Sequence, residues 1–172
     1  IPYAKKIPDK AVIKSWPTLE KNGLVFVWQD AEGNGPIPEQ EPARQGDCYS
    51  GEWTDWQMAA IPIKSLGREL VDNMADMAHF GPIHYSKVKS FKNTMEGHKF
   101  VQYMVGGHQI LTEGDGGLIT SVATYEGPAY MTTTMTGLMD GHPMTTHLLV
   151  SHIPVDMNNF IINFGVMMKK DP

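Results

Sequence analysis

The sequence predicts an α+β fold, in which one long helix lies beside an antiparallel sheet. Three features predict it: a length of 172 residues, a helical period over residues 65–80, and short β-rich segments from residue 99 onward. The length suits one domain with a sizeable buried core. In such an arrangement a curved sheet can wrap around the helix and leave a cavity between them. We therefore expect a single domain with an apolar space between helix and sheet.

The composition excludes several classes of protein. Apolar residues make up 41% and charged residues 19%, which excludes a disordered, collagen-like or coiled-coil chain. With 14 basic and 19 acidic residues the net charge is −5, and no run of Lys or Arg exceeds two residues, so we expect no nucleic-acid partner. The longest apolar stretch, residues 24–28, is far below the ~20 residues of a membrane span, so none is expected.

The lone cysteine and the two ends of the chain indicate its cellular context. Cys48 has no second cysteine with which to form an internal disulfide, and one thiol cannot build a Cys-rich zinc site or an iron–sulfur cluster. We therefore expect a reducing, cytoplasmic location. Residues 1–6 carry neither an initiator Met nor an apolar signal region, and residues 169–172 directly follow a strand-like segment. The chain is expected to be a piece of a longer protein.

The first expected elements are a hairpin, a loop and a strand. Asn22-Gly23 is a favourable hairpin turn, flanked by β-rich residues 11–16 and 24–28. Residues 30–47 contain three prolines and hardly any aliphatic residue, which indicates an exposed loop rather than a linker between domains. A strand is expected at residues 53–63.

The predicted helix begins at Ser65, which can cap it, and ends before Gly81-Pro82, because proline lacks an N–H and pushes the preceding residue out of the α region. Its apolar arc consists of Leu66, Leu70, Met74, Met77 and Ala78. Its opposite arc consists of Glu69, Asp72, Asn73, Asp76, His79 and Phe80. Such an arc is also typical of a helix face in water. The bend places His84 just beyond the helix.

The remaining chain predicts an antiparallel meander, because short β-rich segments alternate with Gly, Asn, Asp or Pro. The expected strands are residues 100–105, 118–125, 129–135, 144–154 and 160–168. Aromatic side chains of this region are expected to line an apolar cavity large enough for a fused-ring ligand. These are Tyr103, Tyr125, Tyr130 and Phe164. Its methionines suit an irregular pocket, although plain core is the more common use.

Four polar residues around the predicted bend carry the candidate chemistry. Asn73, Asp76, His79 and His84 follow one another at spacings of three, three and five. On an unbroken helix the two histidines would point about 140° apart, but the break at Gly81-Pro82 lets both imidazoles meet at one metal ion. The spacing lacks the pattern of His-Glu-x-x-His, which disfavours a zinc protease. Two histidines with a carboxylate are typical of non-haem Fe(II), with open positions for O₂ and substrate.

This pattern, Asn-x-x-Asp-x-x-His-x-x-x-x-His, resembles the mononuclear iron motif of the Rieske-type non-haem iron oxygenases. Further segments resemble the oxygenase component of 3-ketosteroid 9α-hydroxylases, so the resemblance covers nearly the whole chain. These segments are residues 1–5, 15–17, 23–28, 91–93, 96–98 and 165–170. The resemblance implies that residues 1–172 are part of a catalytic domain with a helix-grip fold. It also implies a monooxygenase that inserts one oxygen atom of O₂ into a C–H bond of a steroid-like substrate.

The resemblance also implies roles for single residues. His79 and His84 match the ligands of the mononuclear Fe(II), and Asn73 matches a residue close to the iron. Asp76 matches the aspartate that bridges toward the 2Fe–2S cluster of a neighbouring subunit. A homotrimer and a separate flavin/iron–sulfur reductase are implied as partners. The other histidines, His98, His108, His142, His147 and His152, show no ligand spacing and receive no role.

The chain departs from the family pattern in two ways. The family's iron-binding carboxylate lies in a C-terminal helix beyond a segment like residues 165–170, so the third ligand is expected beyond residue 172. Asp140 and Asp156 lie in turn-like contexts and Asp171 is terminal, so none replaces it. The Cys-x-His and Cys-x-x-His pairs of the 2Fe–2S domain are absent, so the chain alone is expected to be inactive. Two alternatives stay open: a Rieske oxygenase acting on another sterol or an aromatic acid, and a metal-free helix-grip module for an apolar ligand.

Overall fold

A computed structural model describes residues 5–45, 50–108, 117–127, 129–139 and 141–170 of the chain. The chain divides into two compact units, Ile1–Glu41 and Pro42–Pro172. The boundary falls inside the connection of residues 30–47. That residues 1–172 are part of one catalytic domain stays a prediction. Cys48 lies outside the described residues. Among the described residues, no helix has the length and hydropathy needed to cross a bilayer.

The first unit contains a two-stranded hairpin, β1 (Thr18–Lys21) with β2 (Leu24–Val27). Asn22 and Gly23 both have positive φ, 56° and 71°, which is the type I′ turn that Asn-Gly favours. The predicted turn is confirmed, but the first strand begins later than residues 11–16. In the described residues of the connection that follows, the helical element is a short 3₁₀ helix, η1 (Pro38–Gln40).

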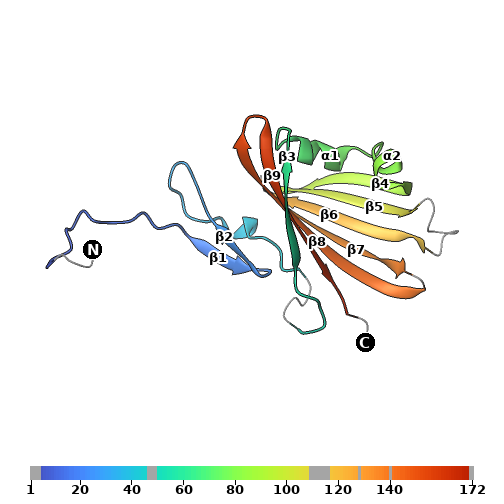
Figure 1. Cartoon of the computed structure of the whole chain (residues 1–172), viewed down its shortest axis with the longest axis horizontal. Helices are drawn as coiled ribbons and strands as arrows, with labels where there is room; N and C mark the ends of the chain where they lie inside the picture. The colour runs from blue at the N-terminus through green and yellow to red at the C-terminus, as the bar shows by residue number, and fades with distance from the viewer. Residues whose placement is uncertain (1–4, 46–49, 109–116, 128, 140, 171–172) are drawn as a thin grey trace. The chain divides into compact units, whose positions relative to one another are not determined.

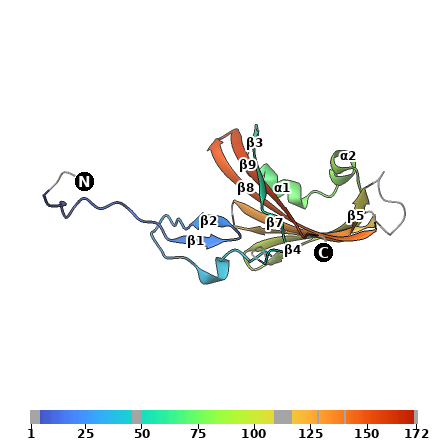
Figure 2. The ribbon, with the colours of Figure 1, turned by 60° about the horizontal axis from the view of Figure 1, so that its bottom comes forward.

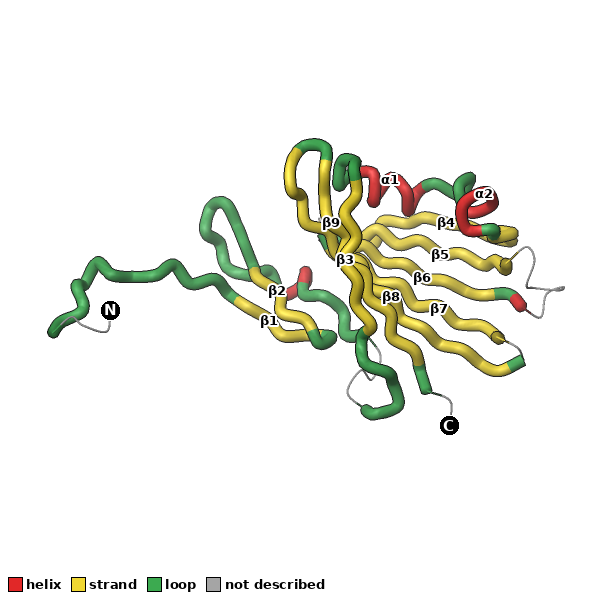
Figure 3. The backbone as a smooth tube through the Cα atoms, viewed as in Figure 1, coloured by secondary structure: helices red, strands yellow, loops and turns green. Residues whose placement is uncertain are grey.

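The second unit is built on one antiparallel sheet of seven strands, in the order β3-β9-β8-β7-β6-β5-β4 (Figure 1). The strands are β3 (Gln57–Ile63), β4 (Ser86–Glu96), β5 (Lys99–His108), β6 (Ile119–Glu126), β7 (Tyr130–Met139), β8 (His142–Asp156) and β9 (Asn159–Met168). The predicted meander is therefore confirmed, with strands longer than expected. Strands dominate this unit, and its helices are short (Figure 3).

Strand β4 was missed by the sequence analysis, for two reasons. Lys87, Lys89 and Lys92 give it a polar character. A register shift between Val88 and Ser90 also breaks the alternation of apolar and polar residues on which strand prediction depends. The strand matters for the site, because helix α2 (Phe80–His84) contacts it.

The long helix expected over residues 65–80 is wrong. The structure has instead a short α1 (Glu69–Ala75), an extended residue at Asp76 with φ −84° and ψ 112°, and then α2. The N-cap of α1 is Arg68 and not Ser65, and no side chain caps it. Pro82 does not end a helix, because it lies in the first turn of α2, where its missing N–H costs little.

Two side chains of the sheet explain why α1 stops where it does. The amide nitrogen Nε2 of Gln102 donates to the carbonyl oxygen of Met74, and Nδ2 of Asn93 donates to that of Ala75 at 3.3 Å. Asn93 and Gln102 are directly paired across β4 and β5. They satisfy the last carbonyls of α1, which otherwise lack partners at a helix end. The chain is then free to turn toward α2.

Helix α1 packs on one face of the sheet, which we call the helix face. Met74, Ala123 and Tyr125 form its buried core, and Val71, Phe100 and Met131 pack against them. Figure 2 shows both helices on the same side of the curved sheet. The predicted arrangement of helix beside antiparallel sheet is confirmed, although α1 is too short for a sheet to wrap around it.

The register corrects the expected lining of the cavity. Tyr125 packs on α1 and so lies on the helix face. Phe164 lies on the same face, because directly paired residues lead to it from Tyr125 through Met131 and Val150. Tyr103 and Tyr130 stand at odd offsets from these positions, so they lie on the opposite face. Only two of the four predicted aromatic residues can therefore face a ligand held under the helices.

We expect Gln102→Leu to lower the free energy of unfolding by about 1–3 kcal/mol, because the buried carbonyl of Met74 loses its donor. Urea denaturation of the second unit measures this change. Gln57→Leu on the exposed edge strand β3 is the control, with an expected change within about 0.5 kcal/mol. Equal stability of the two variants would contradict the role given to Gln102.

Candidate metal centre

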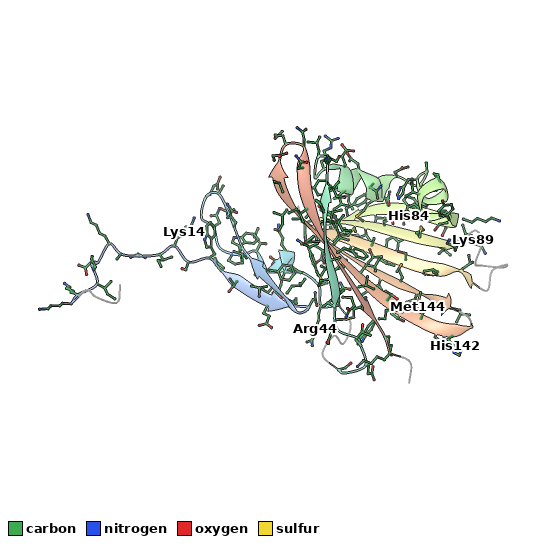
Figure 4. The ribbon with its side chains drawn as sticks, in the orientation of Figure 1. Lys14, Arg44, His84, Lys89, His142 and Met144 are labelled. Carbon is green, nitrogen blue, oxygen red and sulfur yellow. The ribbon has the colours of Figure 1, made fainter. Side chains whose placement is uncertain are left out.

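The two candidate histidines lie at the two ends of α2. His79 is the N-cap residue and His84 is the last residue of this one-turn helix. Their ring centroids are 5.1 Å apart, with the rings edge to face at 70°. Figure 4 shows His84 on α2, above the end of the sheet formed by β4 and β5. Rings at this separation can place one nitrogen each at about 2.1 Å from a shared ion. The two imidazoles therefore lie close together, but no break at Gly81-Pro82 brings them there, because both of these residues lie inside α2. That the two rings share a metal ion stays a prediction.

An aromatic contact fixes these rings against the sheet. The Phe80 ring lies 4.5 Å from that of His79 and 5.5 Å from that of His84. It also meets Phe91 of β4 edge to face, with centroids 5.9 Å apart. Neither phenylalanine was singled out from the sequence as part of a site. The signal that would have found Phe91 is the strand β4 itself, since Phe91 projects to the helix face there.

The electrostatics of the pair favour metal ligation. Burial lowers the pKa of His84, and the nearby His79 lowers it further, so the neutral imidazole that binds metals is favoured. Nδ1 of His79 is buried and has no hydrogen-bond partner. Buried polar atoms without partners are rare and call for an explanation. A metal ion bound by these two rings provides such an explanation. A histidine that binds a metal through one ring nitrogen usually donates the N–H of its other ring nitrogen to a carboxylate.

Asp76 stands where such a carboxylate is needed. Its Oδ2 lies 3.4 Å from Nδ1 of His79, without forming a hydrogen bond in this structure. Its Oδ1 accepts from the backbone N–H of Ala78 at 2.8 Å, which holds the turn between α1 and α2. The side chain of Asp76 is half exposed. One oxygen thus shapes the turn, and the other points toward the imidazole.

The third metal ligand is not found in the described part of the chain. No group of three His, Cys, Asp or Glu side chains that could hold a metal occurs there. The oxygens of Asp156 accept from the N–H of Asn158 and from the side chain of Asn159, so this carboxylate belongs to the β8–β9 turn. Asp140 and Asp171 lie outside the described residues. Asn73 is exposed on α1, and the described residues show no hydrogen bond from it to either histidine.

Two of the histidines without an assigned role lie within the sheet, where His147 is buried and His152 is half-buried. Nδ1 of His147 is 3.0 Å from the hydroxyl of Thr134, and its ring stacks on Trp53 at 4.6 Å. His152 lies against Gly67, where an added Cβ would be 3.2 Å from the imidazole ring. Burial lowers the pKa of both histidines. His147 lies on the face of the sheet opposite the helices, whereas His152 lies on the helix face, where its Nδ1 is 3.4 Å from the hydroxyl of Tyr125. Figure 4 places His142 on β8, far along the sheet from His84.

The lowered pKa of His147 predicts acid sensitivity. The unfolded chain binds a proton near pH 6.5 and the folded chain only at lower pH, so stability falls as the pH drops below 6.5. We expect Tm to decrease between pH 7.5 and 5.5, and less so in His147→Gln. Calorimetry at the two pH values measures this, with His98→Gln, an exposed position, as the control. An unchanged pH dependence in His147→Gln would contradict the prediction.

Comparisons with known proteins identify the family of the chain. The family described as 3-Ketosteroid 9alpha-hydroxylase C-terminal domain matches residues 27–172. An oxygenase component of 3-ketosteroid-9-alpha-monooxygenase from Rhodococcus rhodochrous is 41% identical over 100% of this chain and 46% of its own length. One from Mycolicibacterium smegmatis is 37% identical, over 99% of this chain and 46% of its own length. The chain therefore spans about half the length of the curated relatives it matches.

The fold itself has a counterpart among solved structures. The crystal structure of dicamba monooxygenase bound to dicamba is similar with a TM-score of 0.65, over 90% of this chain and 49% of that chain. The two sequences are only 13% identical, so this likeness concerns the fold alone. It supports the mostly antiparallel architecture with few helices.

Proposed function

The chain belongs to the 3-Ketosteroid 9alpha-hydroxylase C-terminal domain family, and on that premise we propose that it forms part of the catalytic domain of a Rieske-type monooxygenase. The proposed reaction is hydroxylation of a 3-ketosteroid with O₂ at a mononuclear Fe(II). The observation that carries the proposal is the pair His79 and His84, edge to face at 5.1 Å, with a buried unpartnered nitrogen beside Asp76. Relatives named for this activity are 37–41% identical to nearly the whole chain.

Each residue of the centre has a proposed task. His79 and His84 hold the iron, which when bound supplies the activation of O₂. Phe80 and Phe91 keep water away from the buried side of the two imidazoles. Asp76 orients His79 and couples the centre electronically to a partner subunit. Asn73 lies one turn before Asp76 and is proposed to approach the iron when substrate is bound.

The remaining components are proposed to come from outside residues 1–172. They are the 2Fe–2S cluster, the third iron ligand and the long helix that a helix-grip fold requires. A flavin/iron–sulfur reductase supplies electrons, and a homotrimer brings a neighbouring cluster close to Asp76. We propose a cytoplasmic location, since the iron centres need a reducing compartment. This chain covers 46% of the length of a curated relative, so the rest of that length can contain these parts.

The decisive experiment uses the whole protein that carries this chain, purified with iron and combined with a reductase of this type. Incubation with androst-4-ene-3,17-dione, reductant and ¹⁸O₂ should yield a hydroxylated steroid with one ¹⁸O atom, detected by mass spectrometry. Turnover of aromatic acids but not of steroids would support the other Rieske oxygenase function instead. Steroid binding by a protein that takes up no iron would support a metal-free binding module.

A further inference from the structure

One row of side chains crosses the helix face of the sheet and starts at the candidate metal centre. Phe91 of β4 contacts Phe80 of α2. Directly paired residues then lead from strand to strand through Phe91, Met104, Ser121, Met135, Thr146 and Met168. Directly paired residues of an antiparallel sheet project to the same face. These six side chains therefore form one continuous line, which we call the cross-sheet row.

Buried hydroxyls interrupt this otherwise apolar row. Ser121 is 6% exposed and Thr146 is 5% exposed. A third hydroxyl, that of Thr133, is 7% exposed and lies beside the row, two residues before Met135 on the same face of β7. Neighbouring strands are about 4.8 Å apart, so Ser121 lies about 10 Å from Phe91 and Thr146 about 10 Å further. The three hydroxyls thus lie at increasing distance from the centre.

These hydroxyls have no partner in the described part of the chain, where no hydrogen bond involves their side chains. An unpaired polar group in apolar surroundings is unfavourable, so proteins seldom keep several of them together. In the described part of the chain, the fully enclosed side-chain atoms that lack a hydrogen-bond partner are His79 Nδ1 and Asn93 Oδ1. The three hydroxyl oxygens are not among them and so stay open to a ligand.

Threonines on the opposite face of the same strand behave differently. Thr132 accepts from Nε2 of Gln45 at 3.0 Å, and Thr134 bonds to Nδ1 of His147 at 3.0 Å. Buried hydroxyls on that face are thus paired within the protein. Among the buried serine and threonine residues of the described sheet, Thr132 on the opposite face is therefore paired, whereas Ser121, Thr133 and Thr146 on the helix face are not.

We propose that Ser121, Thr133 and Thr146 line the polar end of the substrate site, and that one of these hydroxyls donates a hydrogen bond to a ketone oxygen of a rigid fused-ring ligand. A ketone oxygen only accepts, and a hydroxyl can donate, so the two match. The methionines of the row supply adaptable apolar surface for the ring system. The ketone then lies remote from His79 and His84, and a carbon further along the rings lies beside them. This inference rests on the proposed function.

The test measures binding of androst-4-en-3-one and of androst-4-ene, which lacks the ketone, to the whole protein that carries this chain. One hydrogen bond should favour the ketone by about 10-fold in Kd in the wild type. Ser121→Ala, Thr133→Val and Thr146→Val should reduce this preference toward 1 in at least one case, with unchanged affinity for androst-4-ene. Thr136→Val is the matched control, because Thr136 is exposed on the opposite face of β7.

Thermal unfolding without ligand gives an independent readout. Removing an unpaired buried hydroxyl should leave Tm unchanged or raise it, whereas removing a structural hydroxyl should lower it. A preference that persists in all three variants, or that Thr136→Val reduces equally, would overturn the inference and leave the proposed function intact. Failure of both compounds to bind the wild type would overturn the inference and the proposed function together.

Discussion

Replacing either His79 or His84 with alanine should remove the mononuclear iron from the protein that carries this chain. Each ring supplies one ligand nitrogen, and the two imidazoles are the only close histidine pair around α2 in the described residues. Loss of an outer partner of a metal ligand already costs about 10–100-fold in affinity, so loss of a ligand should cost more than about 100-fold. Iron content per protein, measured by mass spectrometry, is the readout.

The fold should survive both substitutions. His84 is exposed, and the core under α1 consists of Met74, Ala123 and Tyr125, none of which touches a ligand ring in the described contacts. Circular dichroism and Tm therefore accompany the iron measurement. His98→Ala, at an exposed position on the turn between β4 and β5, is the matched control and should keep its iron. Full iron retention in His79→Ala or His84→Ala would refute the assignment of that residue.

Changing Asp76 to asparagine should abolish most turnover while the iron, the 2Fe–2S cluster and the oligomer remain. Asparagine keeps the Oδ1 that accepts from Ala78, so the turn between α1 and α2 survives. It loses the charge that faces Nδ1 of His79 at 3.4 Å. Outer partners of metal ligands contribute about 10–100-fold to activity, and a role in electron transfer between subunits should exceed that.

Single-turnover kinetics separates the two roles of Asp76. With a prereduced cluster, the variant should oxidise the mononuclear centre and form product more than about 100-fold more slowly than the wild type. Asp72→Asn is the control, because Asp72 lies on α1, four residues before Asp76, and pairs only with the exposed Arg68 among the described contacts. A wild-type rate in Asp76→Asn would show that Asp76 is an ordinary solvated carboxylate.

Structural elements that depend on neighbouring residues in the chain could be predicted from the sequence. Asn22-Gly23 produces its hairpin turn, because both residues tolerate positive φ. Six of the seven strands of the main sheet were located from β-rich segments and turn residues alone, and β4 was missed. The closeness of His79 and His84 was also predicted, but for a reason that is wrong. No break separates them, because Gly81 and Pro82 lie inside α2, and the two rings lie 5.1 Å apart at the ends of this one-turn helix.

Features that depend on contacts between residues far apart in the sequence could not be predicted and are seen only in the tertiary structure. Helix α1 ends at Ala75, because Asn93 and Gln102, which come from two strands later in the chain, take up its last carbonyls. Strand β4 escaped prediction because a bulge, defined only by its pairing with β5, shifts its alternation. The face on which Tyr103 projects was likewise set by register. Local patterns report a residue's neighbours in sequence, whereas hydrogen bonds and cross-strand pairs join residues that the sequence keeps far apart.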